Sequence, residues 1–358
     1  MSDLVYLDAP DLGELEKKFL NEAIDSGYVS TAGPFVPKFE EEFFQYIGSH
    51  SVSVQSGTAA LHMALYQAGI GPGDEVIVPA LTFAATVNPV LYVGATPVLV
   101  DVDPDTWTIN TREIEKHINQ HTKAIIPVHL YGNPCDMTEI MDIAARSDLI
   151  VIEDATESLG ARYGEKYTGT LGHFGCFSFN GNKTMTTGGG GMVVGQSKDN
   201  IDHIRFLVNQ AREEARGYYH PEMGFNLRMT NLAAALGLAQ LRRLPHFLEK
   251  KRAFREAYEK DLSHRMQLQK IKPGRKSSNW LVSGKVENNI DDLLAELKKS
   301  TIQARRVFMP LSCFEYLGYE QVHQNAMEIY NHGICLPTSS LNHLNSIHKV
   351  IKTLNRFL

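Results

Sequence analysis

The chain has 358 residues, with 35 Lys and Arg against 41 Asp and Glu, so its formal net charge is -6. This length allows two domains, or one large α/β domain with an appendage. With 43% hydrophobic and 21% charged residues, the composition predicts a packed globular protein and excludes wholesale disorder. The mildly acidic balance argues against a dedicated nucleic-acid binder, so a small-molecule partner is expected.

Cysteine usage and the N-terminus predict a cytoplasmic protein. The four cysteines form no CxxC pair and are too scattered for a disulfide framework: Cys135, Cys176, Cys313 and Cys335. Residues 1–19 carry acidic groups where a signal peptide is basic, and they lack an apolar core. No stretch approaches the ~20 apolar residues of a membrane span, so no membrane partner is expected.

Short apolar runs recur through the first half of the chain. Runs of β-branched residues without polar alternation are typical of strands buried on both faces, and here they lie at 51–54, 76–78, 97–102, 124–128, 149–152, 176–179 and 192–194. Residues 59–68 and 113–120 can supply connecting helices. We therefore predict an α/β fold with a mostly parallel sheet and a ligand at the carboxyl ends of its strands.

The second half changes character. Residues 241–260 predict a long charged helix with a break at Pro245. A strand at 280–286 and helices at 290–299 and 347–357 follow. We expect a large α/β domain over 1–245 and a small C-terminal α+β domain over 246–358.

The first motif with chemical meaning is Ser56-Gly57-Thr58, between a short strand and a helix. Because a helix start presents unpaired N–H groups and the positive end of the helix dipole, a glycine and a hydroxyl there can hold a phosphate. A simple N-cap with nothing bound is the alternative.

The second motif is an apolar strand that ends in two acids, Glu153 and Asp154. Carboxylates at the end of a buried parallel strand lie where an open sheet collects its ligand, and Asp154 could pair with a protonated ring nitrogen. An N-cap is again the alternative.

The third motif is the loop 177–191, where Lys183 is followed by hydroxyl residues and four glycines. A lysine that forms a Schiff base benefits from a desolvated or cationic site that lowers its pKa. A flexible glycine loop with an incidental lysine is the alternative. Together, a phosphate cradle, an acid for a pyridine nitrogen and a lysine for an aldehyde meet the requirements of pyridoxal 5'-phosphate.

At this point the chain resembles the DegT/StrS-type sugar-nucleotide aminotransferases, which are fold type I pyridoxal phosphate enzymes. The resemblance runs continuously from about residue 5 to 260 and is carried by segments 56–65, 74–110, 124–134, 151–194 and 223–241. After residue 260 it is loose, although residues 335–341 resemble the closing segment of the family.

The resemblance implies roles for the residues that match its motifs. Lys183 corresponds to the lysine that binds the cofactor aldehyde and then carries protons, and Asp154 to the acid on the pyridine nitrogen. Phe83 corresponds to the aromatic ring stacked on the cofactor, and Glu157 to a residue near the ring hydroxyl and the lysine.

The phosphate ligands implied by the resemblance are Gly57, Thr58 and Ser178. Asn226 corresponds to a residue that reaches the phosphate from the neighbouring subunit. The resemblance therefore implies a homodimer with shared active sites.

Two departures from the family pattern concern loop shape. Gly189 stands where the family often has glutamate, and residues 172–176 read GHFGC where a Gly-Asp usually precedes the strand.

Other polar residues are weaker candidates for the site. They are His129, His173 and His220 as neighbours of the site, and Arg212, Arg216, Arg228, Arg305 and Arg306 for a substrate diphosphate. His117 and His121 are four residues apart without a zinc motif, and no metal is expected.

By resemblance, the reaction moves an amino group from L-glutamate, releasing 2-oxoglutarate, to a nucleotide-linked keto sugar for glycan biosynthesis. Within the family, the FNGNK form of the lysine loop at 179–183 resembles the enzymes that aminate the 4-keto group of UDP-2-acetamido-2,6-dideoxy sugars, on the routes to bacillosamine and legionaminic acid, so this resemblance implies such an acceptor. A GDP- or dTDP-keto-sugar aminotransferase such as a perosamine synthase is the alternative. A sugar dehydratase, a nicotinamide-dependent oxidoreductase and a non-catalytic regulator are further alternatives, but Lys183 speaks against the dehydratase branch and no GxGxxG follows a strand.

Overall fold

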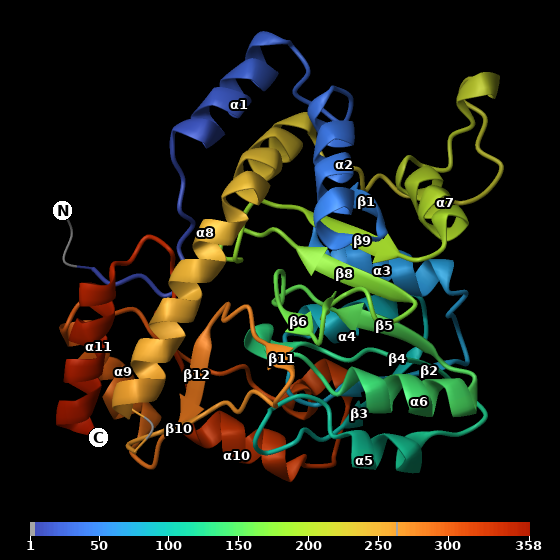
Figure 1. Ribbon diagram of the computed structural model, residues 1–358. Coiled ribbons are helices and arrows are strands. Elements are labelled where there is room, and N and C mark those ends of the chain that lie inside the picture. The colour runs from blue at the N-terminus through green and yellow to red at the C-terminus, as the bar shows by residue number, and fades with distance from the viewer. Residues whose placement is uncertain (1–3, 263) are drawn as a thin grey trace.

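The computed structural model describes residues 4–262 and 264–358, and it is built around a seven-stranded sheet (Figure 1). Its strands are β1 (His50–Val54), β2 (Glu75–Pro79), β3 (Thr96–Val100), β4 (Thr122–Ile125), β5 (Ile150–Asp154), β8 (Phe174–Ser178) and β9 (Gly191–Gly195). They lie in the order β1-β9-β8-β5-β4-β2-β3, and only β9 runs antiparallel to its neighbours. All seven strands match the apolar runs, so the prediction of a mostly parallel sheet is confirmed.

Both faces of this sheet are buried, which explains why most of its strands lack polar alternation. In β1 the alternating residues Ser51 and Ser53 are buried as well. The helices of this half of the chain are α1 (Glu14–Asp25), α2 (Phe35–Ile47), α3 (Gly57–Gln67), α4 (Ala84–Tyr92), α5 (Thr111–Ile114), α6 (Met137–Ser147) and α7 (Lys198–Val208). In β2, Val76 and Val78 pack in one core cluster with α3 and α4, whereas Ile77 faces a second cluster with α6. The helix expected over 113–120 is only the short α5 and a 3-10 turn.

The C-terminal part is a second, smaller α+β layer. Its antiparallel sheet has the order β10-β12-β14-β13, with strands β10 (Gln267–Leu268), β12 (Val282–Lys285), β13 (Arg305–Arg306) and β14 (Gly333–Leu336). Helices α9 (Ile290–Lys299), α10 (Gln324–His332) and α11 (Leu344–Phe357) accompany it. A three-stranded sheet, β11 (Arg275–Lys276), β6 (Arg162–Tyr163) and β7 (Lys166–Tyr167), joins a C-terminal strand to a hairpin of the first half.

The helix α8 (Asn231–Leu262) connects the two parts and runs through Pro245 without ending, so the expected break there is wrong. Pro245 removes one helical hydrogen bond, which costs ~3 kcal/mol. Leu244 and Phe247 on either side are buried, and this packing offsets the loss. Figure 1 shows α8 running from α1 and α2 to α11. The expected domain boundary at 245/246 therefore falls inside one helix, and the division into two domains stays a prediction.

Candidate active site

One cavity of ≈ 190 Å³ brings the three sequence motifs together at the carboxyl ends of the central strands. Six of the eight residues predicted for the site line it: Gly57, Thr58, Phe83, Glu157, Ser178 and Lys183. Asp154 lies buried at the end of β5, and Asn226 lies elsewhere. The wall is completed by Ser56, Ala85, Thr156, Asn180, Asn182, Gly189, Gly190, Trp280, Arg305 and Phe308.

The start of helix α3 forms an anion cradle in this cavity. Ser56 is the N-cap, and its hydroxyl accepts a hydrogen bond from the Ala59 amide at 3.1 Å. The amides of Gly57 and Thr58 are the ones that a helix start leaves without an intrahelical acceptor. A Cβ on Gly57 would lie only 2.8 Å from the Ser178 Cβ, so glycine is what lets the serine come this close. The cap and the cradle thus coexist, and the group suits a phosphate.

Asp154 is 2% exposed and held rigidly from two sides. Its Oδ2 accepts a hydrogen bond from the Thr86 hydroxyl at 2.7 Å, and its Oδ1 accepts from the hydroxyl of Thr156 at 2.6 Å and from the amide of Thr156 at 3.1 Å. Donors on both oxygens fix the orientation of the carboxylate, as a partner for a ring nitrogen requires.

Lys183, whose side chain is 14% exposed, pairs with the buried Glu157 in the cavity, with Nζ 3.7 Å from Oε1. Burial lowers the pKa of Lys183, while Glu157 and Asp154 oppose the shift. Burial raises the pKa of Glu157, which the lysine opposes in turn. The other oxygen of Glu157 accepts the Tyr131 amide at 2.8 Å, and Tyr131 takes a left-handed backbone with φ 57° to present it. A lysine with a lowered pKa holds more of its amine unprotonated, which is the form that attacks an aldehyde.

An aromatic wall that the sequence did not reveal lies against Lys183. The Trp280 ring is 4.2 Å from Nζ, and its indole N–H donates to the Asn182 carbonyl at 2.7 Å. Phe308 packs against Phe83, with 5.4 Å between ring centroids. The only sequence signal was that Trp280 is one of two tryptophans and begins a predicted strand.

Arg305 is the one of the five candidate arginines that lines this cavity. Its guanidinium stacks on Trp280 and Phe308, at 5.5 and 4.9 Å to the ring centroids. Its Nε and Nη2 atoms are buried, with no hydrogen-bond partner among the described residues. A buried guanidinium with two unused donors is a site for an anion.

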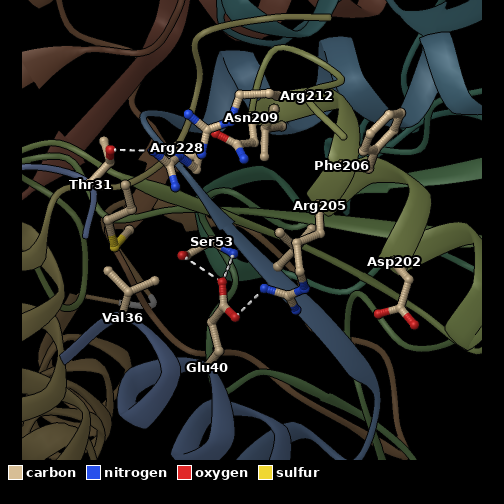
Figure 2. Close-up of a pocket in the computed structure, with 13 residues that line it drawn as sticks. Thr31, Val36, Glu40, Ser53, Asp202, Arg205, Phe206, Asn209, Arg212 and Arg228 are labelled. Atoms are coloured by element: carbon tan, nitrogen blue, oxygen red, sulfur yellow. Dashed lines mark hydrogen bonds and ion pairs between the residues drawn. The ribbon is translucent and has the colours of Figure 1, made fainter. Parts of the chain in front are cut away.

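The other four arginines lie outside the cavity. Figure 2 shows Arg212 and Arg228 in a separate pocket, where Arg228 donates to the Thr31 hydroxyl at 2.6 Å. Arg216 pairs with Glu213, and Arg306 with Asp291 at 2.9 Å.

The candidate histidines have structural partners. His129 is fully buried, with Nε2 2.8 Å from Glu153 Oε2 and Nδ1 accepting the Cys135 amide. His173 accepts the Val151 amide at Nδ1, and His220 bonds the Gln210 carbonyl. None of the three lines the cavity.

Asn226 is exposed and pairs through its backbone with Asn209, which lines the pocket of Figure 2. The described residues of this chain therefore do not bring the Asn226 side chain to the cradle.

Two glycines mark the departures from the family pattern. Gly189 lines the cavity and has open space around its Cβ position, whereas Gly175 abuts the Gly169 carbonyl.

Within residues 4–262 and 264–358, no group of three His, Cys, Asp or Glu is placed to hold a metal ion. Within the same ranges, no helix is both long and apolar enough to cross a bilayer. The four cysteines are free thiols, and Cys313 alone is exposed.

Comparison with known proteins places this site in a family. The model of the DegT/DnrJ/EryC1/StrS aminotransferase family matches residues 10–355. The chain is 40% identical to GDP-perosamine synthase of Escherichia coli O157:H7 over 353 residues, which covers 97% of each protein. It is 41% identical to GDP-perosamine synthase of Caulobacter vibrioides over 321 residues, covering 87% of this chain and 86% of that protein.

Solved structures agree with these relatives. A putative sugar aminotransferase from Streptococcus pneumoniae in its PLP-form has a TM-score of 0.94 at 26% identity, covering 99% of this chain and 98% of that one. Its PMP-form matches with the same TM-score. The predicted fold and cofactor are therefore confirmed: the chain is a sugar aminotransferase whose cofactor is pyridoxal phosphate, for which the cradle, Asp154 and Lys183 supply fitting groups. From the cavity and these matches together, the chain belongs to the DegT/DnrJ/EryC1/StrS aminotransferase family.

Proposed function

We propose that this chain transfers the amino group of L-glutamate to the 4-keto group of a GDP-linked deoxy sugar, with Lys183 as the catalytic lysine. The observation that carries the proposal is the amine of Lys183, which shares one cavity with an anion cradle and lies 3.7 Å from the buried Glu157 carboxylate. The GDP-perosamine synthase relatives support the nucleotide and the sugar.

The residues around the cavity divide the tasks of this reaction. Pyridoxal phosphate, when bound, supplies an aldehyde for the amino group and a ring that spreads the charge of a deprotonated carbon. Asp154 would keep a proton on the ring nitrogen, Phe83 would cover the ring, and the amides of Gly57 and Thr58 with the Ser178 hydroxyl would bind the phosphate.

Lys183 carries protons once its amine is free. Burial lowers the pKa of this amine, so near neutral pH it can accept a proton from the α-carbon of the amino donor. It can then deliver that proton to the neighbouring carbon of the cofactor. Glu157, 3.7 Å away, holds the amine in place, and the Trp280 ring keeps water from it.

Arg305 is proposed to bind a carboxylate of the amino donor. Nε and Nη2 lie on the same edge of the guanidinium, and this edge matches two carboxylate oxygens. Arg305 and Lys183 lie against the same Trp280 ring, so an anion held by Arg305 stays close to the reacting amine.

Replacing Arg305 with glutamine is expected to weaken glutamate use by roughly 10- to 100-fold, because one bidentate charged contact is lost. Single-turnover absorbance measures the two halves separately: glutamate with the aldehyde form of the enzyme, and the sugar nucleotide with its amine form. Arg306→Gln is the matched control, since Arg306 is paired with Asp291 outside the cavity. A loss confined to the sugar-nucleotide half would instead assign Arg305 to the diphosphate.

The acceptor is tested with purified enzyme, glutamate and a panel of GDP-, UDP- and dTDP-linked 4-keto sugars. The lysine loop predicts a UDP-linked N-acetylated sugar, but the relatives favour the GDP-linked alternative. We expect 2-oxoglutarate to form fastest with the GDP-linked 4-keto sugar. Turnover restricted to the UDP sugar would overturn this choice and restore the loop-based one.

We also propose a homodimer in which Asn226 completes the partner's phosphate site. Its exposure away from the cavity of its own chain supports this arrangement, as do the exposed Tyr218 and Met223 in the same segment. Light scattering of the purified protein should give the mass of two chains or a multiple of it, and a monomer that binds cofactor fully would contradict the proposal.

A further inference from the structure

Lys251 is a buried lysine that the proposed reaction leaves unused. It lies on α8, is 3% exposed, and donates from Nζ to the Thr338 carbonyl at 2.9 Å and to the Trp280 carbonyl at 3.2 Å. Both acceptors are uncharged. Burial lowers the pKa of Lys251 to about 7, and the Asp8 carboxylate opposes this shift. Because burying an ammonium without a carboxylate contact is costly, such a residue points to a role beyond packing.

The ammonium ties three separate segments of the chain together. Residue 251 belongs to α8, Trp280 precedes β12, and Thr338 follows β14. The Thr338 hydroxyl also donates to the Trp280 carbonyl, at 2.5 Å. The Trp280 carbonyl therefore receives two donors, and its backbone is fixed relative to both α8 and the small sheet.

The other end of Trp280 reaches the cavity. Its indole N–H donates to the carbonyl of Asn182, the residue before Lys183, at 2.7 Å. The ring lies 4.2 Å from Lys183 Nζ, a distance at which an aromatic face attracts a cation and excludes water. The position of the ring thus sets part of the environment of the reacting amine.

We infer that Lys251 is a positioning residue: its ammonium holds the Trp280 backbone so that the indole covers Lys183. This inference rests on the proposed role of Lys183. Without the ammonium, the Thr338 carbonyl loses this donor and the Trp280 carbonyl keeps only the Thr338 hydroxyl. The ring then moves more freely, water reaches Lys183, and the desolvation that lowers its pKa weakens.

Lys251→Met tests the inference because methionine keeps an unbranched apolar stem and removes the charge. Lys250→Met is the matched control: Lys250 is the preceding residue on α8 and donates to the Ser340 carbonyl, not to Trp280. One readout is the pH at which the absorbance of the Lys183-linked cofactor changes. We expect Lys251→Met to raise this pH by roughly one unit, because the desolvation that lowers the pKa of Lys183 weakens. One unit is about the effect of one charge-assisted hydrogen bond.

A second readout needs no cofactor. In the apoprotein, the tryptophan emission should move to longer wavelength in Lys251→Met, since Trp280, which is 2% exposed, gains access to water. Thr338→Val removes the other donor to the same carbonyl and should shift both readouts in the same direction. The double variant should be non-additive, because the two side chains share one acceptor. Thr338→Val alone tests the inference if Lys251→Met does not fold.

The outcomes are distinct. A wild-type protein with no cofactor attached to Lys183 would overturn the proposed function, and this inference with it. A normal wild-type attachment with unchanged absorbance and emission in Lys251→Met would overturn the inference alone. Equal shifts in Lys250→Met would also overturn it, since they would reflect general loosening of α8.

Discussion

Lys183→Ala is expected to lower the rate of amino transfer by about 10³-fold or more, because the same amine attaches the cofactor and moves the proton. The attachment is checked directly: borohydride reduction of the wild-type protein should add the mass of the cofactor less one oxygen atom to the peptide that contains Lys183, because water leaves when the imine forms and reduction adds two hydrogens. The variant should show neither this mass nor the absorbance of the linked cofactor.

Lys183→Arg tests whether residue 183 must lose a proton or need only carry a positive charge. Arginine keeps a cation over Trp280, but its guanidinium does not lose its proton in the accessible pH range. We expect it to be as inactive as the alanine variant while remaining folded. A cofactor mass on another lysine, or near-wild-type turnover in either variant, would contradict the assignment.

Asp154→Asn is expected to lower kcat by roughly 10²- to 10³-fold, the usual loss when a group that stabilises developing charge is removed. Without the carboxylate, the ring nitrogen of the cofactor loses the partner that keeps it protonated. The fold should tolerate the change, because the Thr82 and Thr86 hydroxyls, 2.8 Å apart, can reverse their hydrogen bonds toward an amide. Single-turnover absorbance with glutamate measures the effect on the chemical step.

Glu153→Gln is the matched control for Asp154→Asn. The neighbouring acid points away from the cavity and accepts the amides of Gly169, Leu171 and Gly172 at 2.6–2.8 Å. Losing its charge should cost about 1.5–3 kcal/mol of the free energy of unfolding, with little change in kcat. If the two variants lost kcat equally, Asp154 would have no special role.

Helices and strands were predictable where the local sequence pattern, such as an apolar run or a helix cap, agreed with the way the segment packs in the fold. The seven apolar runs became the seven strands because a strand that is covered on both faces of the sheet is buried on both. The helix expected over 290–299 has the same bounds in the structure, since Asn289 caps its start through two amides. The break expected at Pro245 was wrong, because tertiary packing of α8 outweighed one lost hydrogen bond.

By itself the sequence determined the sheet, the cradle at Ser56-Gly57-Thr58, the acid at Asp154 and the lysine at 183, because each of these lies within a few residues of a strand end. Only the tertiary structure chose Arg305 among five arginines and laid Trp280 against Lys183. Those choices depend on contacts between residues nearly a hundred or more positions apart, such as the bond from Trp280 to the Asn182 carbonyl. No local pattern encodes such a contact, since it exists only after the small sheet has packed onto the large one.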